Sequence, residues 1–213
     1  NGIKKISKER ILIELYKILD LKNFINLNES IYLKEIFILI FPELNNLKRL
    51  DRLLKICNFS QISRVLLLAV LLIDDKNSHE YFGHKYNVSN NIKNSLNLLA
   101  KNLKLLKVNK DFLNKDLEKN IYLNDKNHLI DLSILNFVFN TKNKLDSFSE
   151  NLKKILKSKT HKFKIDGKYL IDNGMSQGAM MGKVLKKLEE EWIRNNFSIT
   201  KNQIKEIIKQ YSN

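Results

Sequence analysis

The stretch "SKERILIELYKIL", Ser7 to Leu19, shows the pattern that decides the fold class. Apolar residues at positions 11, 12, 15, 16, 18 and 19 have the spacing of a broad face of an α-helix. Ser7 is a residue type that caps helix N-termini. Arg10 and Glu14 are four residues apart on the polar face, so we expect them to pair. The stretch therefore predicts a packed helix that begins after Ser7.

The same spacing recurs along the whole chain of 213 residues, which contains only one proline and six glycines to interrupt it. We predict that Pro42 ends the second helix, that Ser60 and Ser89 cap two later ones, and that Thr200 with Gln203 forms a capping box for the last. An all-α fold follows. The predicted helices cover residues 7–19, 31–41, 45–57, 60–74, a stretch from Ser89, 111–120, 126–140, 145–157, 177–195 and 200–212.

The net charge of +15 and the isoelectric point of about 9.7 favour a polyanionic partner, either nucleic acid or an acidic membrane surface. Lysine outnumbers arginine by 33 to 5 and asparagine is common, which is typical of an AT-rich coding bias and weakens the charge argument. Between nucleic acid and no anionic partner, the composition favours nucleic acid.

The longest apolar run, "VLLLAVLLI" from Val65 to Ile73, indicates a buried helix and no membrane contact. Nine helical residues extend about 14 Å, roughly half the thickness of a bilayer core. No signal peptide is recognisable. With a single cysteine, Cys57, nothing indicates an oxidising compartment. We expect a cytoplasmic protein.

No catalytic or metal-binding residue is predicted. Asp74 and Asp75 lie near His79 and His84, but no His-Asp dipeptide is present, and the five-residue separation of the two histidines does not place both on one helix face. We interpret this stretch as a solvated loop. The sequence also has no phosphate-binding loop, no nucleophile elbow and no Cys-x-x-Cys motif.

Four of the six glycines lie within the stretch from Gly167 to Trp192, just before a long charged helix. Gly174 can adopt positive φ and end a short helix. We predict that Ser176 caps the next helix, which would carry Gly178 and Gly182 four apart on one face. These two glycines would leave a flat strip of bare backbone.

Two neighbours fit such a strip equally well: a second helix packed against it, or an RNA phosphate at the helix N-terminus. Lys168 and Lys183 would add positive charge beside the phosphate. Trp192 could stack on a base, but its place in the apolar stripe of the same helix favours core packing. His128 and His161 are isolated in the sequence and are interpreted as surface or structural residues.

The C-terminal stretch resembles the tail of bacterial tRNA nucleotidyltransferases and of the related poly(A) polymerases. The resemblance is carried by a Gly-x-x-Leu turn, three further glycines, a Leu-x-x-Leu pair and a phenylalanine before the last helix. Gln177 and Ala179 stand where the family usually has prolines, which makes the loop less rigid. The matching residues are Gly167, Leu170, Gly174, Gly178, Gly182, Leu185, Leu188 and Phe197.

The N-terminal stretch is similar to the end of the neck of the same family, and "FPEL" at 41–44 matches its Pro-Glu-Leu. The matches run in the family's order from residue 7 to about 205. The chain begins at Asn1, so we expect it to be part of a longer protein. The neck residues that match are Ser7, Glu9, Arg10, Ile11, Glu14, Leu15, Lys17, Ile18 and Leu19.

The resemblance implies an elongated multi-helix array of neck, body and tail modules, expected at residues 1–75, 76–160 and 161–213. It implies binding of the acceptor and TψC arms of tRNA, with Lys168, Gly174, Gly178, Gly182 and Lys183 as RNA-binding candidates. Arg10 and Glu14 would support the neck. A catalytic head absent from this chain would use Mg²⁺, CTP and ATP to add CCA. Poly(A) addition, or a free-standing basic helical module, remains the alternative.

Overall fold

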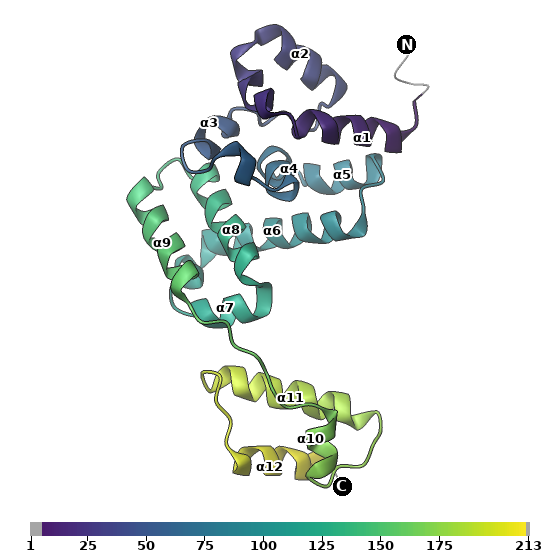
Figure 1. Cartoon of the computed structure of the whole chain (residues 1–213), viewed down its shortest axis with the longest axis vertical. Coiled ribbons are helices and arrows are strands. Elements are labelled where there is room, and N and C mark those ends of the chain that lie inside the picture. The colour runs from purple at the N-terminus through teal and green to yellow at the C-terminus, as the bar shows by residue number, and fades with distance from the viewer. Residues whose placement is uncertain (1–5, 212–213) are drawn as a thin grey trace. The chain divides into compact units, whose positions relative to one another are not determined.

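The computed structural model describes residues 6–211, apart from the side chains of two residues within helices. This range holds twelve α-helices, three 3₁₀-helices and no strand, which confirms the all-α prediction (Figure 1). The α-helices are α1 (Lys8–Leu19), α2 (Ile31–Ile40), α3 (Arg49–Leu53), α4 (Arg64–Leu72), α5 (Ser78–Lys85), α6 (Asn90–Val108), α7 (Leu117–Asn124), α8 (Lys126–Phe139), α9 (Leu145–Lys157), α10 (Gly167–Asp172), α11 (Met180–Arg194) and α12 (Lys201–Tyr211), and the 3₁₀-helices are η2 (Lys22–Glu29), η3 (Phe59–Gln61) and η4 (Lys110–Leu113).

The helices form two compact units. The first unit holds the described residues up to Asp116 together with Lys126–Lys157, and the second holds Leu117–Asp125 and the described residues from Ser158 onward. The second unit therefore consists of α7 and α10 to α12. The predicted module boundary after residue 160 falls close to the start of the C-terminal part of this unit, whereas the predicted boundary after residue 75 falls inside the first unit.

Helix α4 is the centre of the first unit. Every residue from Leu66 to Leu72 is buried, as expected for the longest apolar run. Helices α5, α6 and α8 all contact α4, and α9 covers α8. Because α4 is apolar on all sides, it has to be surrounded, and the amphipathic α6 and α9 supply the faces that meet solvent.

Two arginines of the short helix α3 hold the C-terminal ends of two other helices. The Arg49 guanidinium donates to the carbonyl oxygens of Val70 and Ile73 at the end of α4, at 2.9 and 2.8 Å. Arg52 donates to the carbonyl of Phe137 at the end of α8, at 2.8 and 3.1 Å, and to two carbonyls beyond it. The last carbonyls of a helix lack partners within it, so these contacts stabilise both helix ends.

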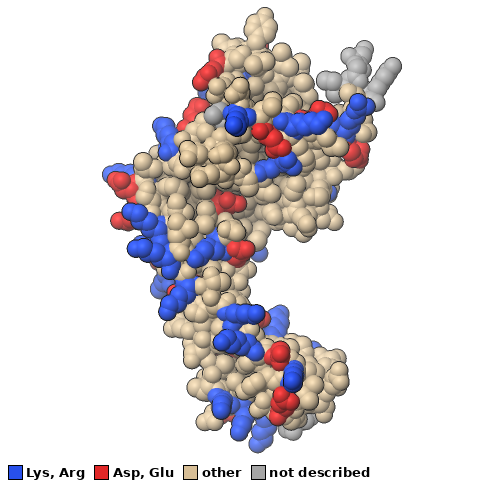
Figure 2. Space-filling view, in the orientation of Figure 1, with Lys and Arg blue, Asp and Glu red and all other residues tan. Residues whose placement is uncertain are grey.

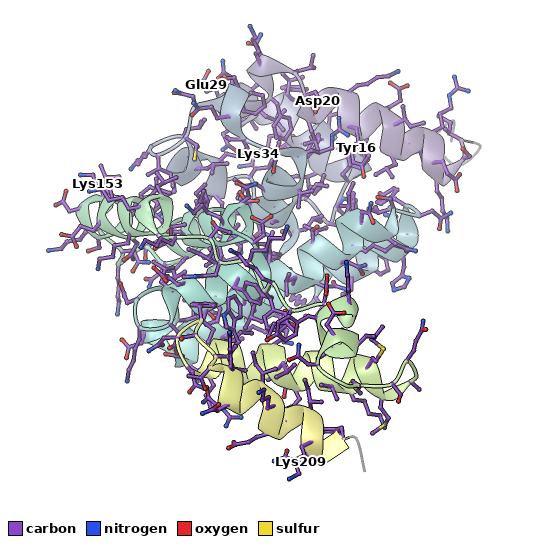
Figure 3. The ribbon with its side chains drawn as sticks, turned by 60° about the horizontal axis from the view of Figure 1, so that its bottom comes forward. Tyr16, Asp20, Glu29, Lys34, Lys153 and Lys209 are labelled. Carbon is purple, nitrogen blue, oxygen red and sulfur yellow. The ribbon has the colours of Figure 1, made fainter. Side chains whose placement is uncertain are left out.

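Arg64 joins the start of α4 to the end of α1. Its guanidinium donates to the carboxylate of Asp20 at 2.6 and 3.4 Å, and it lies 4.4 Å from the centre of the Tyr16 ring. Tyr16 lies in the last turn of α1 and Asp20 is its C-cap, four residues further on (Figure 3). One arginine therefore contacts both.

The second unit has its own small core between α10, α11 and α12. Its buried residues are Leu170, Met175, Val184, Leu188, Ile204, Ile207 and Ile208, and half-buried residues such as Phe163 and Tyr169 pack around them. Val184 and Leu188 are four apart on α11, which confirms the apolar stripe predicted for that helix.

Several predicted helix ends are confirmed. The Ser7 hydroxyl accepts a hydrogen bond from the Arg10 N–H, and α2 ends at Ile40, two residues before Pro42. Thr200 and Gln203 exchange the bonds of a capping box, since each side chain accepts from the other residue's backbone N–H.

Other predicted boundaries are wrong. Only Arg49–Leu53 of the expected helix 45–57 is α-helical, because the backbone beyond it tightens into bonds three residues back, as from Ile56 N–H to Leu53. Ser63 caps α4 instead of Ser60, and its hydroxyl accepts from the Leu66 N–H at 3.1 Å. Ser89 precedes α6, but no cap bond is made by its side chain.

Positive and negative side chains are interspersed on the faces of the units seen in Figure 2. The charges on this face therefore do not single out one binding site, and a candidate site is located from the local geometry. Among the described residues, no helix is long and apolar enough to span a bilayer.

Candidate nucleic-acid interface

A cleft of about 870 Å³ opens on the surface of the second unit. One wall is the chain segment that leads into α10, and the other is the turn from α11 into α12. Five aromatic or imidazole rings and three lysines line it, and none of its described lining residues is acidic. We call this feature the aromatic cleft; its rings are His161, Phe163, Tyr169, Trp192 and Phe197, and its lysines are Lys162, Lys164 and Lys201.

Four of the rings, those of His161, Phe163, Trp192 and Phe197, form one connected cluster. The Phe197 ring lies parallel to the His161 ring, with centroids 3.8 Å apart and planes 7° from parallel. Trp192 meets Phe197 edge-on at 4.9 Å and contacts Phe163 at 5.3 Å. The edge-to-face contacts have the favoured aromatic geometry, and together with the close His161–Phe197 stack they hold the shape of the cleft.

Helix α7 contacts this cluster through Glu118 and Tyr122. The Glu118 carboxylate lies 2.6 Å from His161 Nε2, and Tyr122 meets the edges of both Trp192 and Phe197. The Tyr122 hydroxyl donates to Glu189 of α11. Burial, reinforced by the negative charge of Glu189, raises the pKa of Tyr122 to about 12, so the hydroxyl stays protonated and donates at neutral pH.

Phe197 occupies a backbone conformation that its residue type rarely adopts. Its φ is +62°, and that of the preceding Asn196 is +52°. The Phe197 N–H donates to the Trp192 carbonyl at 2.8 Å and so ends α11. A non-glycine residue in this region is destabilised by about 1–3 kcal/mol, and such strain is found at ligand sites more often than elsewhere. The turn therefore keeps a large ring at a place where glycine would be easier to accommodate.

The structure confirms that Gly174 adopts positive φ and ends a short helix. With φ at +90°, Gly174 follows the end of α10, and its N–H bonds to the Ile171 carbonyl at 2.9 Å. The Met175 N–H bonds to the Leu170 carbonyl at 3.0 Å, and both side chains lie in the core. This is the Schellman arrangement, which satisfies the last carbonyls of the helix.

The predicted glycine strip is wrong in its geometry. Helix α11 begins at Met180, so Gly178 lies outside the helix and Ser176 is not its cap. Glycine is a poor helix former, and two glycines within five residues shift the start beyond Gly178. No described atom comes within 4 Å of a Cβ built on Gly178 or Gly182, so no described helix packs there. A Cβ built on Gly167, by contrast, would lie only 2.9 Å from Met181 Cε.

The RNA-binding candidates chosen from the sequence do not line the aromatic cleft. Lys168 and Lys183 are both exposed. Lys168 directly precedes the cleft residue Tyr169, but Lys183 stands nine residues before Trp192, or about 14 Å along α11. Lys183 therefore lies near the start of α11, whereas Trp192 of the cleft lies near its end.

The expected pair of Arg10 with Glu14 is replaced by another ion pair. Glu14 binds Lys17 at 2.9 Å, three residues further along α1. Arg10 and Glu14 instead share an apolar groove of about 400 Å³ in the first unit, which is lined otherwise by Ile6, Ile11, Ile18, Ile40 and Phe41. Their support of a neck stays a prediction.

Two of the acidic and histidine residues near position 75, Asp74 and His79, have structural roles at the start of α5. The Asp74 carboxylate accepts from the Lys76 and Ser78 N–H groups and from the Ser78 hydroxyl, at 3.0, 3.0 and 2.6 Å. These bonds start α5, and His79 is buried within it. The expectation of a solvated loop holds for Asp75, which is exposed before α5, and is wrong from Ser78 onward, where α5 buries His79 and Phe82. No cluster of three or more His, Cys, Asp or Glu suited to a metal occurs among the described residues.

One pattern in the sequence indicates the aromatic cleft. In "THKFKI", residues 160–165, lysines alternate with a histidine and a phenylalanine. Alternation of basic and aromatic residues in an extended segment places charges on one side and rings on the other. The stretch alone does not show what its rings contact, because the other wall of the cleft is formed by residues after Glu191.

No protein-family model, no curated protein and no solved structure matches this chain.

Proposed function

We propose that this chain is the tRNA-binding helical portion of a CCA-adding tRNA nucleotidyltransferase that works in the cytoplasm. The order of motifs from Ser7 to about residue 205 supports the family. The aromatic cleft carries the RNA-binding half of the proposal, because it combines five rings with three lysines and has no acidic residue among its described lining. Aromatic faces stack on bases and lysines neutralise phosphates, so the pairing suits RNA.

The contribution of this chain to the reaction is positional. Exposed lysines on both units neutralise phosphates and release counterions, and the helical surfaces follow the shape of the folded tRNA. Binding the acceptor and TψC arms would fix how far the 3′ end reaches. CTP, ATP and Mg²⁺ belong to a head domain absent from this chain. The described residues offer no group fit to hold a metal, so no metal-dependent step is assigned to them.

Two alternatives share the same RNA surface. Poly(A) addition would use the same helical region with a different head and neck. A free-standing basic helical module would bind nucleic acid without any enzyme. The purified chain with ATP, CTP and Mg²⁺ is expected to add no nucleotide to tRNA, and turnover by the chain alone would overturn the division of labour.

The binding proposal is tested by fluorescence anisotropy with labelled tRNA at increasing salt. Lys162→Gln, Lys164→Gln and Lys201→Gln together are expected to weaken binding about tenfold or more and to lower the salt slope by about 2–3. The matched control replaces Lys186, Lys205 and Lys209, which are exposed on α11 and α12 and do not line the cleft. Equal weakening by both triple variants would contradict a role for the cleft.

A second comparison separates the family from the non-specific module. tRNA is expected to compete for the chain more strongly than a single-stranded RNA of the same length, because the body is proposed to recognise the folded shape. Equal competition would favour the free-standing module.

A further inference from the structure

The wall of the aromatic cleft that precedes α10 is an extended segment, residues 160–165. His161, Phe163 and Ile165 are half-buried toward the cluster, and Thr160, Lys162 and Lys164 are exposed. This is the alternation of an extended chain, in which every second residue shares a side. The two lysines therefore project on the same side, about 7 Å apart along the chain.

The backbone of this segment is also open to a ligand. Residues 159–165 make no backbone hydrogen bond with any other described residue, so their N–H groups face solvent or the cleft. Free backbone N–H groups beside lysines are donors to phosphate oxygens. This wall of the cleft thus offers backbone N–H groups and two lysines as donors to phosphates, and the rings of the cleft lie beside them.

The size and contents of the cleft suit a nucleotide. Its volume of about 870 Å³ lies within the range of about 300–1,000 Å³ that is typical of small-ligand pockets. Trp192 and Phe197 are half-buried, so each keeps part of its ring open to the space. The stack on His161 and the edge-on contact with Trp192 hold the Phe197 ring in place before any ligand arrives.

We propose that the aromatic cleft captures an unpaired nucleotide of RNA, with its base against the Trp192 and Phe197 rings and its phosphates on Lys162 and Lys164. In a double helix the bases are stacked inside and cannot reach rings in a concave cleft, whereas loops and single-stranded ends can. This inference rests on the proposed function, because it names the part of the RNA that the same cleft reads. An acidic peptide would pair with the lysines, but its acidic side chains would not stack on the rings.

The test uses the chain's single tryptophan, Trp192, as a reporter inside the cleft. A uridine octamer is expected to quench its fluorescence and to bind about tenfold or more tightly than an abasic octamer with the same phosphates. A blunt RNA duplex and an octaglutamate peptide are expected to leave the fluorescence unchanged. Equal binding of the uridine and abasic octamers would overturn base capture, and equal quenching by octaglutamate would favour a peptide.

Two variants separate the base from the phosphates. Phe197→Gly keeps the positive φ without strain and removes the ring, so it is expected to abolish the preference for the uridine octamer and leave abasic binding unchanged. Lys162→Gln with Lys164→Gln is expected to weaken both octamers by the same factor. If Phe197→Gly retains the full preference, the ring is not a stacking wall. Circular dichroism of each variant is the control for folding.

Direct tRNA binding keeps the two proposals apart. If tRNA binds in a manner that depends on the cleft lysines while both octamers bind equally, the capture of a base is overturned and the proposed function stands. If the chain does not bind tRNA but distinguishes the octamers, the proposed function is overturned and the cleft remains a nucleotide site.

Discussion

The rings of His161 and Phe197 lie face to face, 3.8 Å apart, although 36 residues separate them in the sequence. His161 comes from the extended segment before α10, and Phe197 comes from the turn that ends α11. Glu118 of α7 contacts the His161 ring from a third part of the chain. The stack therefore joins the two walls of the aromatic cleft, and its position depends on the backbone at Asn196 and Phe197.

The turn after α11 is expected to be sensitive to side-chain type at Asn196, whose φ is +52°. Asn196→Ala should lower the free energy of unfolding by about 1 kcal/mol, since alanine tolerates the left-handed region less well than asparagine. Asn196→Gly is the control and should leave stability unchanged or raise it slightly. Urea titration measures both variants. Equal effects of alanine and glycine would mean that the side chain, and not the backbone, matters there.

The glycines after α10 should respond to alanine in opposite directions. Gly174→Ala is expected to destabilise the chain by about 1 kcal/mol, because φ is +90°. Gly182→Ala is expected to stabilise it by about 0.5–1 kcal/mol, because Gly182 lies within α11 and has open space around it. Thermal unfolding with the two variants side by side is the measurement. Destabilisation by Gly182→Ala would indicate a close neighbour at that position.

The same Gly182→Ala variant tests the phosphate alternative for the bare backbone. If an RNA phosphate approaches there, the added methyl group should weaken tRNA binding in spite of the higher stability. If tRNA binding is unchanged, the glycine serves neither a helix contact nor a phosphate contact. Gly178→Ala provides a matched comparison just outside the helix, with equally open space.

We expect the half-buried Arg52 to be among the charged residues that contribute most to stability. It donates to one carbonyl in the last turn of α8 and to two carbonyls beyond the helix, and it lies 4.4 Å from the centre of the Phe137 ring. Arg52→Met is expected to lower the free energy of unfolding by about 2–3 kcal/mol, because these carbonyls lose a charged donor. Arg194→Met removes only an exposed pair with Glu191 and should change stability by less than about 0.5 kcal/mol. Similar effects of the two changes would contradict the capping role.

Asp131 on α8 should make the chain less stable as the pH rises. Burial raises the pKa of its carboxyl from the ordinary 3.8 to about 6. Between these values the folded chain binds the proton more tightly than the unfolded chain, so stability falls as the pH increases from about 4 to above 6. Asp131→Asn is expected to raise stability at pH 7.5 by about 1–2 kcal/mol, a figure reduced for partial exposure, and to have little effect at pH 4. Denaturant midpoints at the two pH values measure it.

A stabilising effect of Asp131→Asn that is the same at both pH values would exclude ionisation as the cause. Asp146→Asn, at the exposed first turn of α9, is the control. It should show no comparable gain at pH 7.5, because an acidic residue in a first helical turn is favourable when charged.

Much of the helical architecture was predictable because it depends on local pattern. The apolar run in α4, the cap at Ser7, the stop at Pro42, the positive φ of Gly174 and the capping box at Thr200 are each set by residues within a turn or two. Helix starts were harder where two residues of similar capping ability stood close together, as with Ser60 and Ser63, and where glycines weakened the first turn of α11.

The sequence by itself determined the helical class, the buried α4 and the chemistry available, namely many lysines, few arginines and no catalytic motif. The tertiary structure alone decided which of these residues meet. Arg52 reaches the end of α8 across 85 residues, and the segment with His161 meets the turn with Phe197 across 36. Helical periodicity reports only neighbours on one face. Contacts between distant segments depend on how the helices pack, so the aromatic cleft became visible only in three dimensions.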